Sequence, residues 1–465
     1  MLFNSPAFLL FFPIVTAGYF LLKHEWRWSW LLLASCFFYM FFRPVYILIL
    51  FFTIAIDYTA GILIENHTDK KKRRFWLIAS IIANCSVLIF FKYINFFNQT
   101  LYDLTGLGNS GSAPLLDILL PVGLSFHTFQ AMSYTIEVYR DKQMAERHLG
   151  IYSLYVMFYP QLVAGPIERP AHLLPQLHER HVFDYERVSK GLRRMLWGFF
   201  KKVVIADRLS FYVNMIYSQP ENFSGNALIW ATFFFGIQIY CDFSGYCDIA
   251  IGAANSMGFN LTENFRLPYF SRNISEFWNR WHISLSSWFR DYVYIPLGGN
   301  RKGIRKWIIN ILIVFAISGL WHGASWTFVV WGLIHGVCLI IYQLVGKKIK
   351  IPVVISVLIT FSVVTIAWIF FRADTVSDAF YILRHFIPTK NNLIGLPLIS
   401  PSSFVLNFLL IGLLFVSESI IEEERKTGYT VIRKPAFRYI LNFSLIMLIL
   451  LFGIFEEQSF IYFQF

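Results

Sequence analysis

Apolar residues recur along this chain in runs of about 17–25, the length that one α-helix needs to cross a bilayer. Because no long polar block separates these runs, residues 1–465 are predicted to form a single integral membrane domain. The pattern predicts an all-α polytopic membrane protein with about 11–13 transmembrane or re-entrant helices. The clearest runs cover residues 6–22, 44–64, 75–97, 226–252, 307–321, 326–345, 351–371, 403–421 and 437–455, and shorter or interrupted runs lie near 29–42, 115–138, 149–164 and 192–217.

Composition agrees with the periodic pattern. The chain is 56% hydrophobic and only 15% charged, whereas a soluble domain has about 25% charged residues. A mean hydropathy of +0.54 excludes a water-soluble globule. The first apolar run follows a short segment with no basic residues and no small-residue cleavage site. We therefore expect a retained helix there rather than a removed signal peptide.

The net charge of +12 does not indicate nucleic-acid binding, because the basic residues lie in short loops between apolar runs. Basic loops of membrane proteins stay on the cytoplasmic side, so the pattern predicts a multi-pass protein of the cell (inner) membrane with its N-terminus outside. The loops expected inside contain Lys23 and Arg27, residues 70–74, residues 140–147 and residues 425–434. The segments expected outside are the turn at Arg43, residues 98–114 and the acidic pair Glu456 and Glu457.

Two histidines lie in tryptophan-rich surroundings. His282 is found in Phe277-Trp-Asn-Arg-Trp-His-Ile-Ser-Leu-Ser-Ser-Trp-Phe289, and His322 in Ser318-Gly-Leu-Trp-His-Gly-Ala-Ser-Trp326. An ionisable group at membrane depth is costly and is by default a functional hypothesis, and histidine transfers protons near neutral pH. The alternatives are structural: an amphipathic helix tolerates an exposed His282, and an interfacial aromatic belt could contain a His322 bonded to a carbonyl.

Residues 275–292 are predicted to form one amphipathic helix. Such a helix could lie on the membrane surface, or it could pack inside the protein with its polar stripe lining a cavity. Pro296 and a Gly-Gly turn then end it. The polar stripe consists of Asn279, His282, Ser286 and Arg290, and the apolar face consists of Phe277, Trp281, Leu285, Trp288 and Tyr292.

Other polar residues have simpler interpretations. Asp242 and Asp248 follow an apolar run, and we expect them to cap or brace helices, with the lining of a polar cavity as the alternative. Glu168 and Arg169 are expected to pair at the surface. His127 and His335 are expected to be structural.

The hydrophilic stretch 165–190 has a pattern of its own. Its prolines, Pro166, Pro170 and Pro175, make a continuous helix unexpected across the first half. Three histidines in and beside this half match no metal-ligand spacing, so we expect solvated loop residues and no metal site. They are His172, His178 and His181.

Several catalytic signatures are missing from the sequence. There is no Gly-x-Ser-x-Gly nucleophile elbow, no P-loop and no dinucleotide fingerprint, and none of the 11 histidines is followed five residues later by Asp. What remains is an intramembrane base without a nucleophile of its own. That combination favours direct transfer between two bound substrates, with no bound cofactor.

The residues around both histidines resemble the membrane-bound O-acyltransferases, and most closely their bacterial alginate O-acetyltransferase branch. The segments that carry the resemblance extend along essentially the whole chain. They are Trp321-His-Gly-Ala-Ser-Trp326, the run from Phe277 to Tyr292, Tyr294-Ile-Pro-Leu-Gly-Gly-Asn-Arg301, Pro160-Gln-Leu-Val-Ala-Gly-Pro-Ile167, Asp242-Phe-Ser-Gly-Tyr246 and Phe460-Ile-Tyr-Phe-Gln-Phe465.

The resemblance implies a ring of membrane helices around a central tunnel, with His322 as the catalytic histidine and His282 as a second catalytic position. His322 would deprotonate an acceptor hydroxyl that attacks an acyl thioester, and His282 would orient or polarise a reacting group. Donors to the developing oxyanion are also needed. The candidate substrate-binding residues are Asn279, Ser286, Arg290, Trp321 and Asp242.

The resemblance also implies the substrates. The donor would be acetyl-CoA or another cytoplasmic acyl thioester, and the acceptor a hydroxyl of an exported, alginate-like polysaccharide or of a partner protein. Peptidoglycan is an alternative acceptor, and a polysaccharide transporter or flippase is the rival class. Because the longest stretch predicted outside, 98–114, is too short to hold a glycan, we expect a separate extracytoplasmic acetyltransferase as partner, besides the lipid bilayer.

Overall fold

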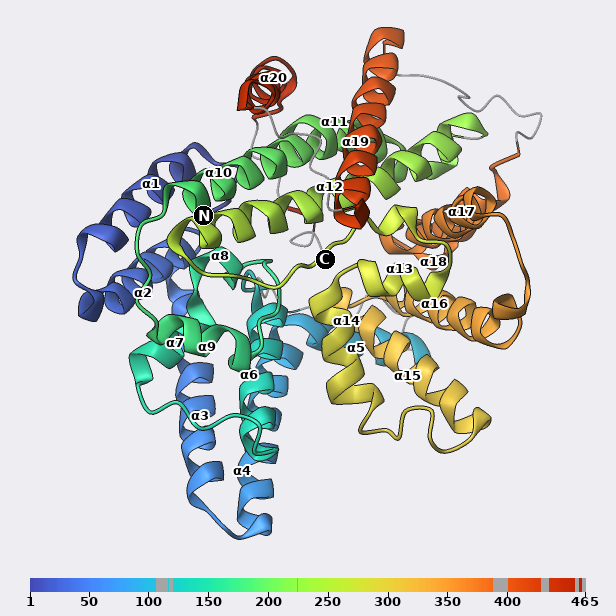
Figure 1. The fold of residues 1–465 in the computed structure, drawn as a ribbon. Coiled ribbons are helices and arrows are strands. Elements are labelled where there is room, and N and C mark those ends of the chain that lie inside the picture. The colour runs from blue at the N-terminus through green and yellow to red at the C-terminus, as the bar shows by residue number, and fades with distance from the viewer. Residues whose placement is uncertain are drawn as a thin grey trace. The chain divides into compact units, whose positions relative to one another are not determined.

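A computed structural model of the chain describes residues 1–105, 116, 120–223, 225–387, 400–427, 435–455 and 460–461. Every regular element in these ranges is a helix, as the ribbon in Figure 1 shows. The all-α architecture predicted from the apolar runs is therefore confirmed. Of the loops used to predict the topology, most of residues 98–114 and 425–434 and the pair Glu456 and Glu457 lie outside the described residues.

Seven helices among the described residues are long and apolar enough to cross a membrane. Most expose the greater part of their apolar window: only 22% of it is buried in residues 70–104, against 83% in residues 226–257. The first kind of helix has a face for lipid, whereas the second is a core helix. The seven are Pro44–Asn66, Lys70–Leu104, Asn226–Met257, Ile304–His322, Trp326–Leu344, Val353–Arg372 and Pro401–Glu423, with Pro6–Leu21 and Tyr439–Phe452 as shorter apolar helices.

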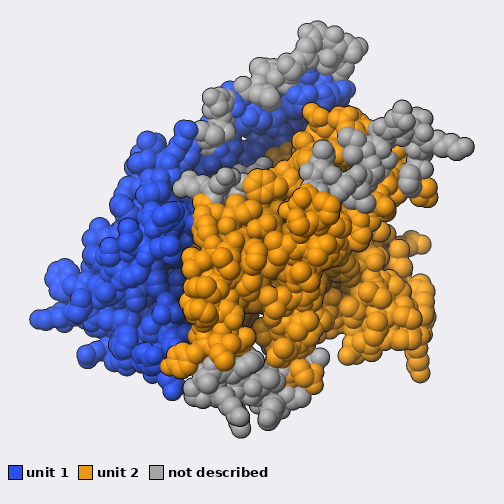
Figure 2. Space-filling view, turned by 90° about the horizontal axis from the view of Figure 1, so that it is seen from above, with its two compact units in different colours: residues 1–195, 249–262 blue, residues 196–248, 263–465 orange. Residues whose placement is uncertain are grey.

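The chain divides into two compact units, coloured blue and orange in Figure 2. Unit 1 comprises residues 1–195 and 249–262, and unit 2 comprises residues 196–248 and 263–465. The single domain predicted from the sequence stays a prediction. Two helices, α10 (Tyr185–Phe199) and α12 (Asn226–Met257), contribute residues to both units.

Unit 1 is held together in its interior by a polar cluster on three helices. The carboxylate of Asp57 in α3 accepts hydrogen bonds from Ser80 (2.5 Å) and Asn84 (2.9 Å) of α4, and Ser80 also donates to Thr135 of α6 (3.2 Å). Buried polar groups persist when they are bonded in this way. The helices of the unit are α1 (Pro6–Leu21), α2 (His24–Met40), η1 (Pro44–Tyr46), α3 (Ile47–Asn66), α4 (Lys70–Leu88), η2 (Ile89–Tyr93), α5 (Ile94–Leu104), α6 (Leu124–Tyr139), α7 (Leu149–Met157), α8 (Tyr159–Leu162) and α9 (Pro170–His178), besides most of α10.

The hydrophilic stretch 165–190 is partly helical. No continuous helix crosses its first half, as predicted, because residues 163–169 are not helical, but the short helix α9 begins at Pro170 and contains Pro175. Proline suits the first helical position, because the N–H that it lacks would have no partner inside the helix there. Pro175 lies beyond the first turn, where it removes the hydrogen bond that an N–H would donate to the carbonyl of Ala171, and α9 ends three residues later.

Unit 2 contains the histidine-bearing segments and a tight helical hairpin. Its elements are η4 (Phe200–Ala206), α11 (Asp207–Tyr217), η5 (Pro220–Asn222), most of α12, η6 (Pro268–Phe270), α13 (Ile274–Arg280), α14 (Ile283–Phe289), η7 (Arg290–Tyr294), α15 (Ile304–His322), α16 (Trp326–Leu344), η8 (Gly346–Lys348), α17 (Val353–Arg372), α18 (Val376–Arg384), α19 (Pro401–Thr427) and α20 (Pro435–Phe452).

Two glycines allow the backbones of α15 and α16 to pack closely. A Cβ atom on Gly319 would collide with the carbonyl oxygen of Phe328, and one on Gly332 would collide with that of Phe315. Gly319 therefore faces Phe328, and Phe315, four residues before Gly319 in α15, faces Gly332, four residues after Phe328 in α16. This is the register of an antiparallel pair. The hairpin therefore places the first residue of α15 and the last residue of α16 at the same end.

Candidate active site

His322 is the last residue of α15, at the turn of this hairpin, and only 3% of it is exposed. Aromatic rings surround its imidazole. The ring centroid of Trp331 lies 5.1 Å away, perpendicular to it, and that of Phe371 lies 5.4 Å away. The side chain is buried within unit 2, so it does not face solvent, and the interfacial aromatic belt stays the structural alternative.

His282 lies at a break between two helices, and not within one. Helix α13 ends at Arg280 and α14 begins at Ile283, while His282 has a φ of 45°, in the left-handed region. A residue other than glycine adopts that conformation at a cost, and such positions cluster at functional sites. The prediction of one continuous helix over 275–292 is thus wrong. His282 is fully buried, whereas Asn279 and Arg290 are exposed.

Asn264 explains the break. Its side-chain Oδ1 accepts hydrogen bonds from the backbone N–H of Ser284 (3.1 Å) and from the Ser284 hydroxyl (2.9 Å), and its backbone carbonyl accepts from the N–H of Ile283 (3.0 Å). These bonds replace the intrahelical partners that the first turn of α14 lacks. Asn264 comes from a loop 18 residues earlier, so no periodic pattern around His282 could have indicated it.

The same amide fixes the proton on His282. The Nδ1 atom lies 3.2 Å from Asn264 Oδ1. A backbone N–H can only donate, so the atom that accepts from Ser284 must be the amide oxygen, and His282 Nδ1 must carry the hydrogen. The lone pair of the neutral ring is then on Nε2. Burial lowers the pKa of His282 to about 3, so this ring is neutral near pH 7 and its Nε2 can accept a hydrogen bond.

The two histidines predicted from the sequence lie together. Their ring centroids are 6.3 Å apart, with an angle of 60° between the planes. The Trp321 ring lies 5.0 Å from His322 and 6.1 Å from His282, and so borders both. Two imidazoles in an aromatic enclosure can bind or exchange a proton with a substrate held between or beside them.

Three other candidates line a separate cavity of about 250 Å³ in unit 2. Asn279, Ser286 and Arg290 belong to it, together with apolar side chains of α13–α15. Two other residues of its wall are close to the histidines in the chain: Ile283 directly follows His282, and Ser318 lies one helical turn before His322. The cavity and the histidine pair therefore share α14 and α15 as walls.

Asp242 has the bracing role that was one of its two interpretations. Its carboxylate contacts the Lys202 ammonium at 2.5 Å and accepts a hydrogen bond from the backbone N–H of Ile461 at 2.7 Å. Asp248 pairs with Lys201 at 2.6 Å. Substrate binding by Asp242 stays a prediction, while its contacts in the structure are with this chain.

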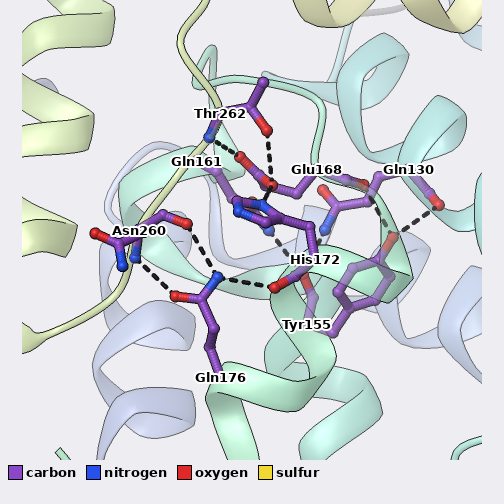
Figure 3. A network of polar contacts seen from close by, with 8 residues as sticks. All are labelled: Gln130, Tyr155, Gln161, Glu168, His172, Gln176, Asn260 and Thr262. Atoms are coloured by element: carbon purple, nitrogen blue, oxygen red, sulfur yellow. Dashed lines mark hydrogen bonds and ion pairs between the residues drawn. The ribbon is translucent and has the colours of Figure 1, made fainter.

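A second buried polar centre lies in unit 1, around Glu168 (Figure 3). Glu168 is fully buried, so the expected surface pair with Arg169 is wrong. One carboxylate oxygen accepts from the Thr262 N–H (2.5 Å), and the other accepts from the Thr262 hydroxyl (3.1 Å) and lies 2.6 Å from His172 Nδ1. Gln176 joins the same segments through the backbone of His172 and of Asn260.

The histidines of the hydrophilic stretch have partners rather than metal-like groupings. His172 contacts Glu168, His178 lies 2.7 Å from Glu146, and His181 lies 2.9 Å from the carbonyl of Gln176. Among the described residues, no group of three or more His, Cys, Asp or Glu side chains is arranged to hold a metal ion.

Comparison with known proteins identifies the family of this chain. Residues 75–371, which include both histidines, match the profile of the membrane-bound O-acyltransferase family. The chain belongs to this family. It is 36% identical over 423 residues to the peptidoglycan O-acetyltransferase of Helicobacter pylori, covering 83% of this chain and 79% of that protein.

Other relatives define the branch. The chain is 38% identical over 387 residues to the probable alginate O-acetylase AlgI of Pseudomonas aeruginosa, covering 82% of this chain and 73% of that protein. A teichoic acid D-alanyltransferase of Bacillus subtilis is 30% identical over 243 residues, 49% of this chain and 60% of that protein. The protein is a multi-pass membrane O-acyltransferase of the alginate O-acetylase-like branch, as the resemblance predicted.

Proposed function

We propose that this protein is an inner-membrane O-acetyltransferase whose chemistry takes place at His282 and His322. The observation that carries the proposal is the meeting of these two residues, with a 6.3 Å separation between ring centroids, inside walls of tryptophan and phenylalanine. Neither the transporter nor the flippase alternative has a specific observation in its favour, since the chain belongs to an acyltransferase family.

The reaction needs one proton acceptor and one polarised carbonyl. His322 takes the proton of an acceptor hydroxyl while the oxygen attacks the thioester carbonyl carbon. The C–S bond then breaks, the acyl group stays on the oxygen, and the departing thiolate takes up the proton. His282, a neutral imidazole with its hydrogen on Nδ1, keeps the lone pair of Nε2 for a donor group of a substrate other than the reacting hydroxyl, and so orients that substrate. A well-placed base contributes roughly 10²–10⁴-fold to the rate.

The developing oxyanion requires a hydrogen-bond donor. Trp331 is the candidate that the geometry favours: it is fully buried, its ring is 5.1 Å from His322, and its indole N–H has no acceptor among the described residues. Asn279, Ser286 and Arg290 line the neighbouring cavity instead. They suit a different task, which is to hold the arm of the thioester donor as it approaches from the cytoplasmic side.

The acceptor is a hydroxyl on the outer side of the membrane. An alginate-like exopolysaccharide is one candidate, supported by the 38% identity to the Pseudomonas protein. Peptidoglycan is the second, supported by the 36% identity to the Helicobacter protein. In either case we propose that a separate extracytoplasmic transferase receives the acetyl group and completes its transfer to the polymer.

The test is a transfer assay with purified full-length protein in proteoliposomes. Acetyl-CoA labelled in the acetyl group is supplied outside vesicles whose lumen holds alginate, peptidoglycan fragments or the extracytoplasmic partner. Label on a luminal hydroxyl, absent with the His322→Ala variant, is the expected result. Movement of polysaccharide across the membrane without any acyl transfer would overturn the proposal, and the polymer that gains label identifies the acceptor.

A further inference from the structure

A cavity of about 520 Å³ in unit 2 lies away from the residues assigned to the reaction. Its walls come from the end of α16, from η8, from the start of α17, and from Arg272 to Ile274 just before and at the start of α13. Three cationic side chains line it, namely Arg272, Lys347 and Lys350, and no acidic side chain does.

These cations are free to bind a ligand. Within the described parts of the chain, none of the three makes an ion pair. The carboxylate of Glu276, four residues after Arg272, already has partners: it accepts a hydrogen bond from the backbone N–H of Arg272 (2.8 Å) and pairs with Arg280 at 2.7 Å. The cavity therefore carries uncompensated positive charge and suits an anionic group.

The remaining wall is apolar and continues onto exposed helix surfaces. Ile341, Ile349 and Ile359 line the cavity and are 48–56% exposed. On α17, a helix apolar enough to span the membrane, Ile359 and Val363 lie one turn apart. A small water-soluble anion would leave this apolar surface exposed, whereas an acyl chain would cover it and gain binding free energy from its burial. Charge and walls together fit an amphiphile with an anionic head.

The cavity also lies on the face where anionic lipids attract protein. The antiparallel α15–α16 hairpin brings η8 to the same end as the loop before α15, which contains Arg301, Lys302, Arg305 and Lys306. The loop before α15 and the segment after α16 are both basic, which indicates that this open end of the hairpin is cytoplasmic. Basic pockets between membrane helices on that side bind phospholipid head groups.

We propose that this cavity is a binding site for an anionic phospholipid of the cytoplasmic leaflet. The phosphate lies among Arg272, Lys347 and Lys350, and an acyl chain lies along Ile341 and Ile359. A lipid in this place links the α16–α17 connection to the segment that leads into α13, and so adds to the contacts that α13 already makes with α16 and α17. The proposal is independent of the acyl donor and acceptor.

The experiment is a lipid titration of the purified full-length protein in mild detergent, followed by native mass spectrometry. Phosphatidylglycerol and phosphatidylcholine with identical acyl chains are compared. We expect phosphatidylglycerol to bind the wild-type protein more tightly. The double variant Lys347→Gln/Lys350→Gln should weaken that binding by about fivefold per lysine, because a basic residue near an anionic lipid contributes on that scale.

Matched variants distinguish lipid binding in this cavity from nonspecific attraction to the positive charge of the loop. Lys348→Gln removes a lysine of the same loop that does not line the cavity, and it should leave binding unchanged. Lys347→Arg/Lys350→Arg keeps the charge and should keep the binding, which excludes misfolding as the cause of a loss. Equal binding of the two lipids, equal effects of Lys348→Gln and of the double variant, or displacement of phosphatidylglycerol by equimolar coenzyme A would each overturn the proposal.

Discussion

Two buried polar centres of this protein, around Glu168 and around the His282–His322 pair, are built in opposite ways. Around Glu168 in unit 1, both carboxylate oxygens are bonded to donors of this chain, from Thr262 and His172. Around His282 and His322 in unit 2, the neighbours are chiefly aromatic rings, among them Trp331 at 5.1 Å from His322 and Phe243 at 4.7 Å from His282.

The contrast separates a brace from a reactive centre. A buried group whose bonding capacity is used by its own chain holds segments together and has little left for a substrate. Asn264 does the opposite for His282: by accepting from Nδ1 it leaves the lone pair at Nε2. The sequence places an ionisable residue in both centres, so the partners, and not the residue types, tell their roles apart.

The largest effect is expected from removing the histidines. His282→Ala should lower acyl transfer by roughly 10²-fold, because the substrate that His282 orients loses its alignment with the other reacting group. The double variant with His322→Ala should be little worse than the more damaging single variant, since groups that act as a unit are not additive. Initial rates of label transfer at matched amounts of folded protein measure both.

His335→Phe is the control for this prediction. His335 is as buried as His282 and stacks on Phe277 with 7° between the planes, and its ring nitrogens make no hydrogen bond to any described residue. A phenylalanine preserves its packing, and we expect the transfer rate to persist. Additive losses in the double variant, or a loss with His335→Phe as large as with His282→Ala, would contradict the pairing of His282 with His322.

Glu168→Ala should act on stability. It leaves the partly buried Thr262 N–H and hydroxyl and the His172 ring without their acceptor. A fully buried donor left unsatisfied costs roughly 1–3 kcal/mol, and a donor that water reaches costs less. We expect a clear fall of the Tm in detergent with an unchanged transfer rate per folded molecule. An unchanged Tm combined with lost transfer would instead place Glu168 in the reaction.

Part of this comparison could be predicted from the sequence, and part could not. The apolar runs at 307–321, 326–345 and 351–371 locate α15, α16 and α17 to within a few residues, because a bilayer fixes helix length. The break at His282 was missed because Asn279, Ser286 and Arg290 continue a helical stripe through it. Asn264, which causes the break, is a single polar residue in a loop, and only the tertiary structure brings it to His282.

Asn264→Asp should change the pH dependence of transfer. The carboxylate still accepts from Ser284 and from His282 Nδ1, but its charge stabilises the imidazolium and raises the pKa of His282 by about 1–3 units. The His282 ring is then protonated, and loses the lone pair of Nε2, at a higher pH than in the wild type. The acidic limb of the rate profile therefore moves to higher pH. A profile of kcat/KM against pH that coincides with that of the wild type would show that Asn264 does not act through His282.

The smallest effect concerns the exposed edge of the Glu168 centre. The hydrogen bond to Glu168 raises the pKa of His172 above its usual value. The charged pair therefore adds stability below the ordinary histidine pKa and loses it as the pH rises through the raised one. Because the His172 side chain is 43% exposed, we expect less than about 1 kcal/mol. The Tm advantage of the wild type over His172→Gln should shrink from pH 6 to pH 9, and an advantage that grows would reverse the assignment.

The most direct test of the central claim is the initial rate of labelled acetyl transfer by purified His322→Ala, with Tm and membrane content measured on the same preparation. If His322 is the base, the initial rate falls by at least about 100-fold, while the Tm and the membrane content stay close to those of the wild type. Transfer near the wild-type rate, or a variant that no longer accumulates in the membrane, would contradict the claim that His322 is the base of the reaction.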